Sequence, residues 1–441
     1  MTVTRRLTRA KKLRVIGVTV LAVALASSCG ARPDEGGGDS DSDGDQTIEF
    51  SLTGGTVPAQ TQVVKDAIAA FEEENPDATV KLTEVGWDQA YSQYQTRLQA
   101  GDPPDIALLA PSWVSTFMES DAFAPADDYV STDILDSFHE SGEDGIVDDE
   151  GTRYGVQWDA SIWGMYYRKD LFEQAGLDPE SPPSTWEELT EAGTKLQAAG
   201  IEPLTFPFQG TDPDSYFLPM MWQAGAELVS EDGTPTVDSP EMLQAAEFLA
   251  GLVADGHVSK DITGQDWEGT MNTFIAGDAA IMFNGPWVVD ALRDSAPDLD
   301  GQWATAAYPE GPAGPGTLGY PNALVISDLS DDKELAGEFI EFLFAERDDV
   351  PSYFFEFMKV TGVIGFTKDF AETDDEYVRD PLIQPFTESV PFARNRPIVP
   401  WYEEFRQRSF DPKLQQLVLG ELTPPELVEQ LAADAEQLAA Q

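Results

Sequence analysis

The chain has 441 residues, of which 80 are Asp or Glu and 26 are Lys or Arg, so its formal charge at pH 7 is −54. This excess of negative charge argues against nucleic acid and anionic membrane surfaces as partners. The chain is also 41% hydrophobic, with 24 Phe and 10 Trp, which excludes a largely disordered protein, and its length exceeds one compact core, so two lobes are expected.

The first residues are typical of an export signal. Basic residues from Arg5 to Arg14 precede an apolar run over residues 15–26 and then two serines. The apolar run is too short to remain as a transmembrane helix, which needs about 20 residues. We therefore expect residues 1–28 to form a secretory signal peptide.

Cys29 is the only cysteine of the chain, so no intrachain disulfide can form. Its position after small residues resembles that of the lipidated cysteine of bacterial lipoproteins. The resemblance implies a lipid anchor at Cys29 on the outer face of the cell membrane, and the alternative is a cleaved signal with an incidental cysteine. Residues 29–46 are rich in Gly, Ser and Asp and are expected to form a disordered linker.

Strand-like and helix-like segments alternate from Thr47 onwards. Strands are expected over residues 47–52, 78–85 and 105–110. A helix is expected between the first two strands, where apolar residues recur at helical spacing up to the stop at Asn75-Pro76. A second helix is expected over residues 91–100, between the second and third strands. Repeated strand–helix–strand order predicts an α/β fold with a parallel sheet covered by helices.

The later part of the chain repeats this organisation. Capping signals at Thr185 and Ser239 predict helices that end near Gly200 and Gly256. Two more amphipathic helices are expected over residues 333–345 and after Pro425.

Several tryptophans stand beside polar, Gly or Pro residues at the ends of expected strands; these are Trp87, Trp113, Trp158, Trp287 and Trp401. Ligands of open α/β sheets bind at the carboxyl ends of strands. An indole face there offers a flat apolar platform that matches the C–H face of a pyranose. Core packing is the alternative for each ring, and it is the role expected of Trp163 and Trp186.

Seven short segments, in this order and spacing, carry a resemblance to a known family. They are FEEENP (71–76), AGDPPDI (100–106), MYYRKDLF (165–172), PSTWEEL (183–189), FIAGDAAIM (274–282), NGPW (284–287) and GELTP (420–424). Together they make the chain resemble an extracellular solute-binding protein of the carbohydrate-uptake ABC transporter class, similar to maltose- and trehalose-binding proteins.

The resemblance implies a two-lobed, hinged α/β fold of the periplasmic-binding-protein type (type II), with the ligand in the cleft between the lobes. Strands would cross between lobes near residues 155–159 and 316–327. Lobe one would comprise residues 47–156 and 323–367, and lobe two residues 157–322 and 368–441. The implied function is to deliver a carbohydrate to ABC permease subunits as a monomer, without catalysis, cofactor or metal.

The resemblance also implies a set of ligand-binding residues. They are Gln60, Ser112, Trp113, Trp158, Asp159, Ser161, Tyr216, Gly285, Trp287, Tyr320, Arg394 and Trp401. Arg396 is an alternative to Arg394, and a surface salt bridge is the alternative role for both.

The acidic composition leaves two explanations open. Carboxylates spread over every segment suit a halophilic surface, because molar salt shortens the Debye length to about 3 Å. A cationic ligand would suit them too, so a binding protein for a polyamine or betaine is an alternative function. A secreted glycoside hydrolase is another alternative, although among 80 acidic residues suitable carboxylate pairs arise easily.

Overall fold

The computed structural model describes residues 46–440 except 55–57, 140–141, 149, 210–212, 231–232, 347–351, 366, 369 and 371–374. The expected signal peptide, Cys29 and the linker up to residue 45 lie outside the described residues. Gln46, assigned to the linker by the sequence, already belongs to the first strand.

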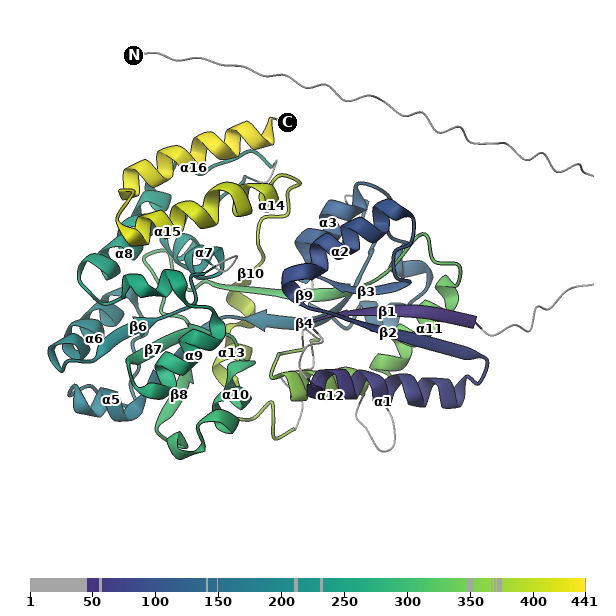
Figure 1. Cartoon of the computed structure of the whole chain (residues 1–441), viewed down its shortest axis with the longest axis horizontal. Coiled ribbons are helices and arrows are strands. Elements are labelled where there is room, and N and C mark those ends of the chain that lie inside the picture. Colours follow the sequence, from purple (N-terminus) through teal and green to yellow (C-terminus); the bar gives the residue numbers. More distant parts are fainter. Residues whose placement is uncertain are drawn as a thin grey trace, which may run out of the picture. The chain divides into compact units, whose positions relative to one another are not determined.

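The first sheet follows the predicted parallel arrangement and then departs from it (Figure 1). Its strands are β1 (Gln46–Thr53), β2 (Ala78–Val85), β3 (Ile106–Leu109), β4 (Val156–Ile162), β9 (Thr317–Ile326) and β10 (Ala393–Arg394). β1 pairs in parallel with β2 and β3, whereas β9 runs antiparallel to β3 and to β4.

Helices cover both faces of the first sheet (Figure 1). They are α1 (Pro58–Glu74), α2 (Trp87–Ala100), α3 (Pro111–Met118), α4 (Thr132–Leu135), α11 (Lys333–Phe344) and α12 (Tyr353–Thr361), with a 3₁₀ turn over Ala126–Asp128. Alternate residues of β3 explain the two layers: Ile106 and Leu108 pack in the core with α1, α11 and α12, and Ala107 and Leu109 pack with α2 and α3.

The second sheet has the strand order β6-β7-β5-β8. Its strands are β5 (Gly164–Arg168), β6 (Glu202–Thr205), β7 (Ala279–Asn284) and β8 (Trp303–Ala306). Both faces are buried: Tyr166 and Met282 pack on one side, and Met165, Tyr167 and Phe283 pack on the other.

The remaining helices cover the second sheet or follow it. They are α5 (Lys169–Gln174), α6 (Trp186–Ala198), α7 (Pro213–Ala224), α8 (Pro240–Ala254), α9 (Trp267–Ala276), α10 (Val288–Ser295), α13 (Gln384–Ser389), α14 (Tyr402–Phe405), α15 (Asp411–Leu419) and α16 (Pro424–Ala439), with short 3₁₀ turns over Lys260–Gly264, Pro297–Leu299 and Val390–Phe392 and a π turn over Arg406–Phe410. No helix among the described residues has the length and apolar character needed to cross a membrane.

The elements expected from the sequence are confirmed with small shifts at their ends. β2 has the predicted bounds, and α1 stops one residue before Asn75. The predicted caps also form, because the Thr185 side chain accepts a hydrogen bond from the Glu188 amide and the Ser239 side chain from the Met242 amide.

Two strands link the sheets along the chain. β4 pairs antiparallel with β9 and continues through Trp163 into β5, and β9 follows the second sheet's last strand. They occupy the two segments where the family resemblance implies crossing strands. The ladder shifts register between Gln157 and Ala160, so a bulge lies in the middle of β4.

Trp158 lies in that bulge, and the structure corrects its expected role. Its indole is 1% exposed and is enclosed by Phe344, Phe354 and Phe357, with ring centroids 5.1–5.6 Å away. Adjacent strand residues point to opposite faces, so Trp158 points into the core when Asp159 points away from it. Trp158 is a packing residue in this structure.

We predict that Trp158→Ala lowers the free energy of unfolding by about 3–5 kcal/mol, because it removes a large buried ring and leaves a cavity. Chemical denaturation followed by circular dichroism measures this loss. Trp267→Ala is the control, since Trp267 is 47% exposed and its truncation should cost less than about 0.5 kcal/mol. Equal losses in the two variants would contradict the packing role.

Candidate functional site

The two faces of β4 differ in chemistry. Val156, Trp158, Ala160 and Ile162 pack in the hydrophobic core, and the alternating positions are Gln157, Asp159 and Ser161. β4 is one of the two strands that link the sheets, and it has one apolar and one polar face. Its polar side chains therefore lie where a ligand can contact both parts of the molecule. This polar face of β4 is the first element of the candidate site.

Asp159 and Asn322 connect the two linking strands. The Asp159 Oδ1 accepts hydrogen bonds from the Asn322 backbone amide at 3.2 Å and from its Nδ2 at 2.6 Å. Asp159 is 7% exposed, and burial raises its pKa to about 6, against the smaller opposing effect of the Asn322 hydrogen bonds. No charge on any described Arg, Lys or His contributes to that shift.

Two buried amide oxygens lie on the same pair of strands. Gln157 Oε1 and Asn322 Oδ1 have no hydrogen-bond partner among the described residues. Their orientation is fixed, because Gln157 Nε2 donates to the His139 carbonyl at 3.2 Å and Asn322 Nδ2 donates to Asp159. Both oxygens are closed to solvent, so the linking strands contain two buried acceptors that lack a donor among the described residues.

Ser161 stands further along the polar face. It is half-buried, and its backbone is paired with that of Tyr320 on β9. The structure thus places the backbone of Tyr320 beside Ser161, two residues along β4 from Asp159.

Aromatic side chains gather at the carboxyl ends of the first sheet's strands. Trp87 and Tyr91 begin α2 after β2, and Trp113 lies in the first turn of α3 after β3. The Trp113 ring centroid is 5.7 Å from that of Trp87 and 5.7 Å from that of Tyr91. Trp87 is 44% exposed, so this aromatic cluster offers part of its surface to a ligand.

A glycine allows Trp87 to sit over the end of β1. A Cβ on Gly54 would lie 2.6 Å from the Trp87 Nε1, and the φ of Gly54 is +82°. Trp87 is one of the tryptophans expected after strands, but it is not among the site residues expected from the sequence. Its position directly after β2 was the signal that could have included it.

Gln60 and Ser112 occupy the first turns of the helices that follow β1 and β3. Gln60 is half-buried in α1, and Ser112 is buried in α3 beside Trp113. Both therefore lie at the same edge of the first sheet as the aromatic cluster.

The segment Asn284–Trp287 connects β7 to α10 in the second sheet. The Tyr166 hydroxyl donates to the Gly285 carbonyl at 2.6 Å, and the Gly285 amide donates to Asn284 Oδ1 at 2.9 Å. A Cβ on Gly285 would lie 1.9 Å from the Trp287 ring, so only glycine lets the indole fold back over this turn. Trp287 is half-buried and meets Trp163 edge-on, with centroids 5.2 Å apart.

The other expected residues of this part differ in exposure. Tyr216 is 3% exposed and stacks on Phe206, so its expected role as a ligand platform is corrected to packing in the core of α7. Trp401 is half-buried at the start of α14, edge-on to Phe405. Arg394 pairs with Glu227 at 2.6 Å and lies over the Trp222 ring, which is the surface salt bridge weighed as its alternative.

A buried ion network holds the segment that carries Trp401. Asp214, at the start of α7, accepts hydrogen bonds from Arg396 at 2.7 Å and from the Tyr402 hydroxyl at 3.0 Å. Burial alone would raise the pKa of Asp214, but Arg396 and Arg406 outweigh it and that pKa lies below its ordinary value. Arg396, the alternative to Arg394, is therefore engaged in the interior.

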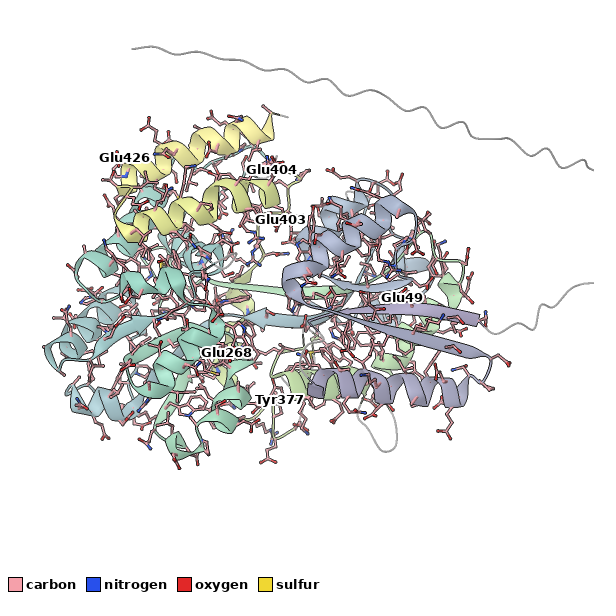
Figure 2. The ribbon with its side chains drawn as sticks, in the orientation of Figure 1. Glu49, Glu268, Tyr377, Glu403, Glu404 and Glu426 are labelled. Atoms are coloured by element: carbon pink, nitrogen blue, oxygen red, sulfur yellow. The ribbon has the colours of Figure 1, made fainter. Side chains whose placement is uncertain are left out.

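Arg406 extends this network. Its guanidinium pairs with Glu403, labelled in Figure 2, at 2.8 Å and with Asp411 at 3.2 Å. Burial and the charge of Asp214 raise the pKa of Asp411 to about 8. The arginines of this segment are thus committed to carboxylates of the protein itself.

Residues 395–403 also reach the part of the molecule built on the first sheet. The Asn395 Nδ2 donates to the Asp144 carbonyl at 3.3 Å. A Cβ on Gly145 would lie 3.0 Å from Ile398 Cδ1 and 2.9 Å from the Pro111 carbonyl oxygen, so this segment approaches the start of α3. Burial and, to a smaller extent, the charge of Glu403 raise the pKa of Tyr91.

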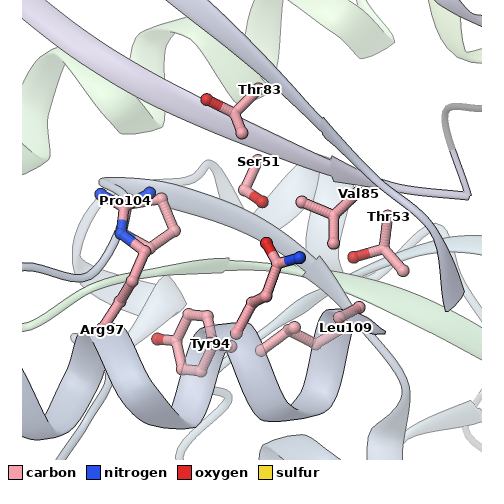
Figure 3. A pocket seen from close by; sticks show the side chains of 10 residues that line it. Ser51, Thr53, Thr83, Val85, Tyr94, Arg97, Pro104 and Leu109 are labelled. Carbon is pink, nitrogen blue, oxygen red and sulfur yellow. The ribbon is translucent and has the colours of Figure 1, made fainter. Parts of the chain in front are cut away.

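A cavity elsewhere is too small to be the ligand site. It lies between the first sheet and α2, has a volume of about 30 Å³ and is lined by Ser51, Thr83, Tyr94 and Arg97 among others (Figure 3). Such a volume accommodates about one or two water molecules. The Arg97 guanidinium there is held by Glu49 at 2.6 Å.

The chain is similar to several known proteins. The family model described as "Bacterial extracellular solute-binding protein" matches residues 55–349. A putative binding protein of Brucella abortus is 31% identical over 84% of this chain and 88% of its own length. A lactose-binding protein of Rhizobium radiobacter is 27% identical over 65% of this chain and 68% of its own.

A solved structure gives the same fold. The ABC transporter solute-binding protein of Thermotoga lettingae, bound with α-D-tagatose, is 26% identical, with a TM-score of 0.77 over 89% of this chain and 99% of that one. The two sheets and their linking strands thus form a two-lobed α/β fold of the periplasmic-binding-protein type, as the sequence predicted.

We predict that Asp159→Asn changes the pH dependence of stability. The Asp159 carboxyl has the ordinary pKa of 3.8 in the unfolded state, so the folded state holds its proton more tightly. The contribution of Asp159 to the free energy of unfolding therefore becomes less favourable as the pH rises through about 4 to 6. From pH 4.5 to pH 7.5, the free energy of unfolding of the variant should therefore rise by about 2 kcal/mol relative to that of the parent.

Urea denaturation at the two pH values measures this difference. Asp66→Asn, which removes an exposed carboxylate on α1, is the matched control. The same pH dependence in Asp159→Asn and in the parent would show that Asp159 does not titrate as its burial requires.

Proposed function

Because this chain belongs to the bacterial extracellular solute-binding proteins, we propose that it binds a carbohydrate outside the cytoplasm and delivers it to the permease of an ABC transporter. The lactose-binding relative and the tagatose-bound structure support a sugar as the ligand class. The proposed protein makes and breaks no bond; it captures the sugar and releases it unchanged.

The observation that carries this proposal is a polar strand face accompanied by partly exposed indoles from both parts of the molecule. Asp159 and Ser161 lie on β4, Trp87 and Trp113 follow strands of the first sheet, and Trp287 follows a strand of the second. A sugar has hydroxyls around an apolar ring face, and it needs both kinds of contact.

The proposed lobes are those expected from the sequence, residues 47–156 with 323–367 and residues 157–322 with 368–441. Lobes joined by a few strands can close on a ligand by small changes at those strands. The bulge in β4 supports a hinge at this point, since a bulge breaks the regular ladder. In the proposed closed form, the two lobes present one surface to the permease.

Several features of the sequence complete the proposal. Residues 1–28 direct export, Cys29 carries a lipid, and the protein acts as a monomer on the outer face of the membrane. The family supports the extracytoplasmic location. The excess of carboxylates would keep the surface hydrated in high salt.

One observation favours a second candidate, a cationic solute such as a polyamine or betaine. Asp159 is a buried carboxylate whose hydrogen-bond partners are the backbone and side-chain amides of Asn322, and an aromatic cluster lies at the carboxyl ends of the first sheet's strands. A quaternary or primary ammonium group binds well to such surroundings.

We predict that titration with mono- and oligosaccharides changes the tryptophan fluorescence and raises the melting temperature, because a ligand that binds only the folded state stabilises it. Spermidine and glycine betaine belong in the same panel. A response to these cations and to no sugar would replace the proposed ligand class by the second candidate, and no response to any member would contradict both.

We further predict that Trp287→Ala and Trp401→Ala each weaken sugar binding about 5- to 150-fold, because each removes an aromatic platform worth about 1–3 kcal/mol. Isothermal titration calorimetry measures the affinities, and circular dichroism checks the fold. Trp267→Ala, on the exposed end of α9, is the control with unchanged affinity. Unchanged affinity in both test variants would show that the platforms are other residues.

A further inference from the structure

The chain between β10 and α14 (Figure 1) forms a loop that is closed by one carboxylate. At its start, Arg396 donates to Asp214 Oδ2 through Nε at 2.7 Å and to Asp214 Oδ1 through Nη2 at 3.3 Å. At its end, the Tyr402 hydroxyl donates to the same Asp214 Oδ2 at 3.0 Å. Asp214 therefore fixes both ends of residues 396–402, which we call the Trp401 loop.

Asp214 is itself held firmly in α7, a helix whose residues are all buried. Its backbone amide donates to Asp411 Oδ1 at 3.0 Å, and Arg396 also donates to the neighbouring Ser215 Oγ at 2.6 Å. Close packing around a buried helix restricts its side-chain rotamers, so Asp214 is a fixed anchor point. Its bonds to the guanidinium and to the hydroxyl are charge-assisted, which makes them the stronger kind.

Two prolines stiffen the Trp401 loop between its fixed ends. Pro397 and Pro400 each hold φ near −65°, which leaves few conformations to so short a loop. Val399 packs against the core of the second sheet, and the Tyr402 amide donates to the Val399 carbonyl at 3.0 Å. The backbone that carries the indole of Trp401 is thus closely defined.

The Trp401 ring is only half-buried, and it meets Phe405 edge-on with centroids 5.6 Å apart. A half-buried indole is not packed on all sides, so its orientation depends on the backbone that carries it. The loop also approaches the part of the molecule built on the first sheet, where Ile398 Cδ1 would lie 3.0 Å from a Cβ on Gly145. That approach is the alternative support for the loop.

Buried charge networks add little net stability, because the loss of hydration offsets much of their attraction, and their better-attested use is to select one conformation. We propose that Asp214 is a positioning residue: by binding Arg396 and Tyr402 it holds the Trp401 indole in the orientation that stacks on the ligand. Asp214 touches no ligand itself and acts through Trp401. The inference rests on the proposed function, in which Trp401 is an aromatic platform.

The test variant is Tyr402→Phe, because a change of Asp214 would leave the largely buried Arg396 without its carboxylate and endanger folding. Tyr402→Phe removes one hydrogen bond to Asp214 and keeps the ring, which is 1% exposed. The matched control is Tyr167→Phe, which removes the hydroxyl that donates to the Pro179 carbonyl at 3.0 Å. Urea denaturation should show both variants folded and less stable than the parent.

The first measurement needs no ligand. The protein is labelled with 5-fluorotryptophan, and the Trp401 fluorine resonance is assigned by its absence in Trp401→Phe. In Tyr402→Phe we expect this resonance to shift or broaden, because the ring leaves its single orientation, and in Tyr167→Phe it should coincide with that of the parent. A resonance that responds to Ile398→Ala and not to Tyr402→Phe would assign the support to the alternative contact and overturn the proposal.

The second measurement is calorimetry with the sugar that binds most tightly. Tyr402→Phe should weaken its binding about 3- to 10-fold, because the platform is misplaced and not removed, and Tyr167→Phe should leave the affinity unchanged. When Trp401→Ala is already present, Tyr402→Phe should change the affinity less than about 1.5-fold, since both substitutions act through one ring. An equal loss with and without Trp401 would show that Tyr402 does not act through it, and would contradict the proposal.

The two measurements separate this inference from the proposed function. If a sugar binds and neither the Trp401 resonance nor the affinity responds to Tyr402→Phe, the positioning role is wrong and the sugar-binding function stands. If no sugar binds to the parent, the proposed function fails, and the role of Asp214 in binding fails with it even where the resonance shifts.

Discussion

The antiparallel pairing of β4 with β9 is the constraint on which the rest of the structure depends. It joins the two sheets, and it fixes which residues of β4 face the core. Trp158 must enter the phenylalanine cluster around Phe354, and its neighbour Asp159 must then point to the opposite face. The same strand thus stabilises the fold with one face and supplies polar groups with the other.

Polar groups at such a position come at a cost in stability. Asp159 is buried with an amide as its hydrogen-bond partner, and two amide oxygens nearby lack donors among the described residues. Proteins keep groups of this kind where a ligand compensates for them, and functional sites are the usual place for shifted pKa values. The buried network of Asp214, Arg396 and Arg406 is different, because its charges satisfy one another and hold the segment before Trp401.

The sequence predicted the elements well because their signals are local. The alternation of apolar residues and the Asn75-Pro76 stop are sufficient to place α1 and β2. It also predicted the two-lobed fold, through short segments whose order resembles one family. It failed for Trp158, because the dipeptide Trp158-Asp159 does not reveal which of the two residues faces the core.

Other site residues depended on contacts between distant parts of the chain. Tyr216 stands in a helix whose residues are all buried, and the apolar run over residues 216–222 was the signal that could have indicated packing. Arg394 and Arg396 differ in partner because Glu227 and Asp214 come from elsewhere in the fold. Trp87 could have been included, since it directly follows a predicted strand, and only the structure shows its contact with Trp113.

A crystal structure of the protein with the tightest-binding neutral sugar tests the central claim most directly. The account predicts a sugar on the polar face of β4, with hydroxyls within hydrogen-bond distance of Asp159 and a ring face on Trp87, Trp113, Trp287 or Trp401. A sugar bound away from β4, or one whose hydroxyls meet neither Asp159 nor Ser161, would contradict it.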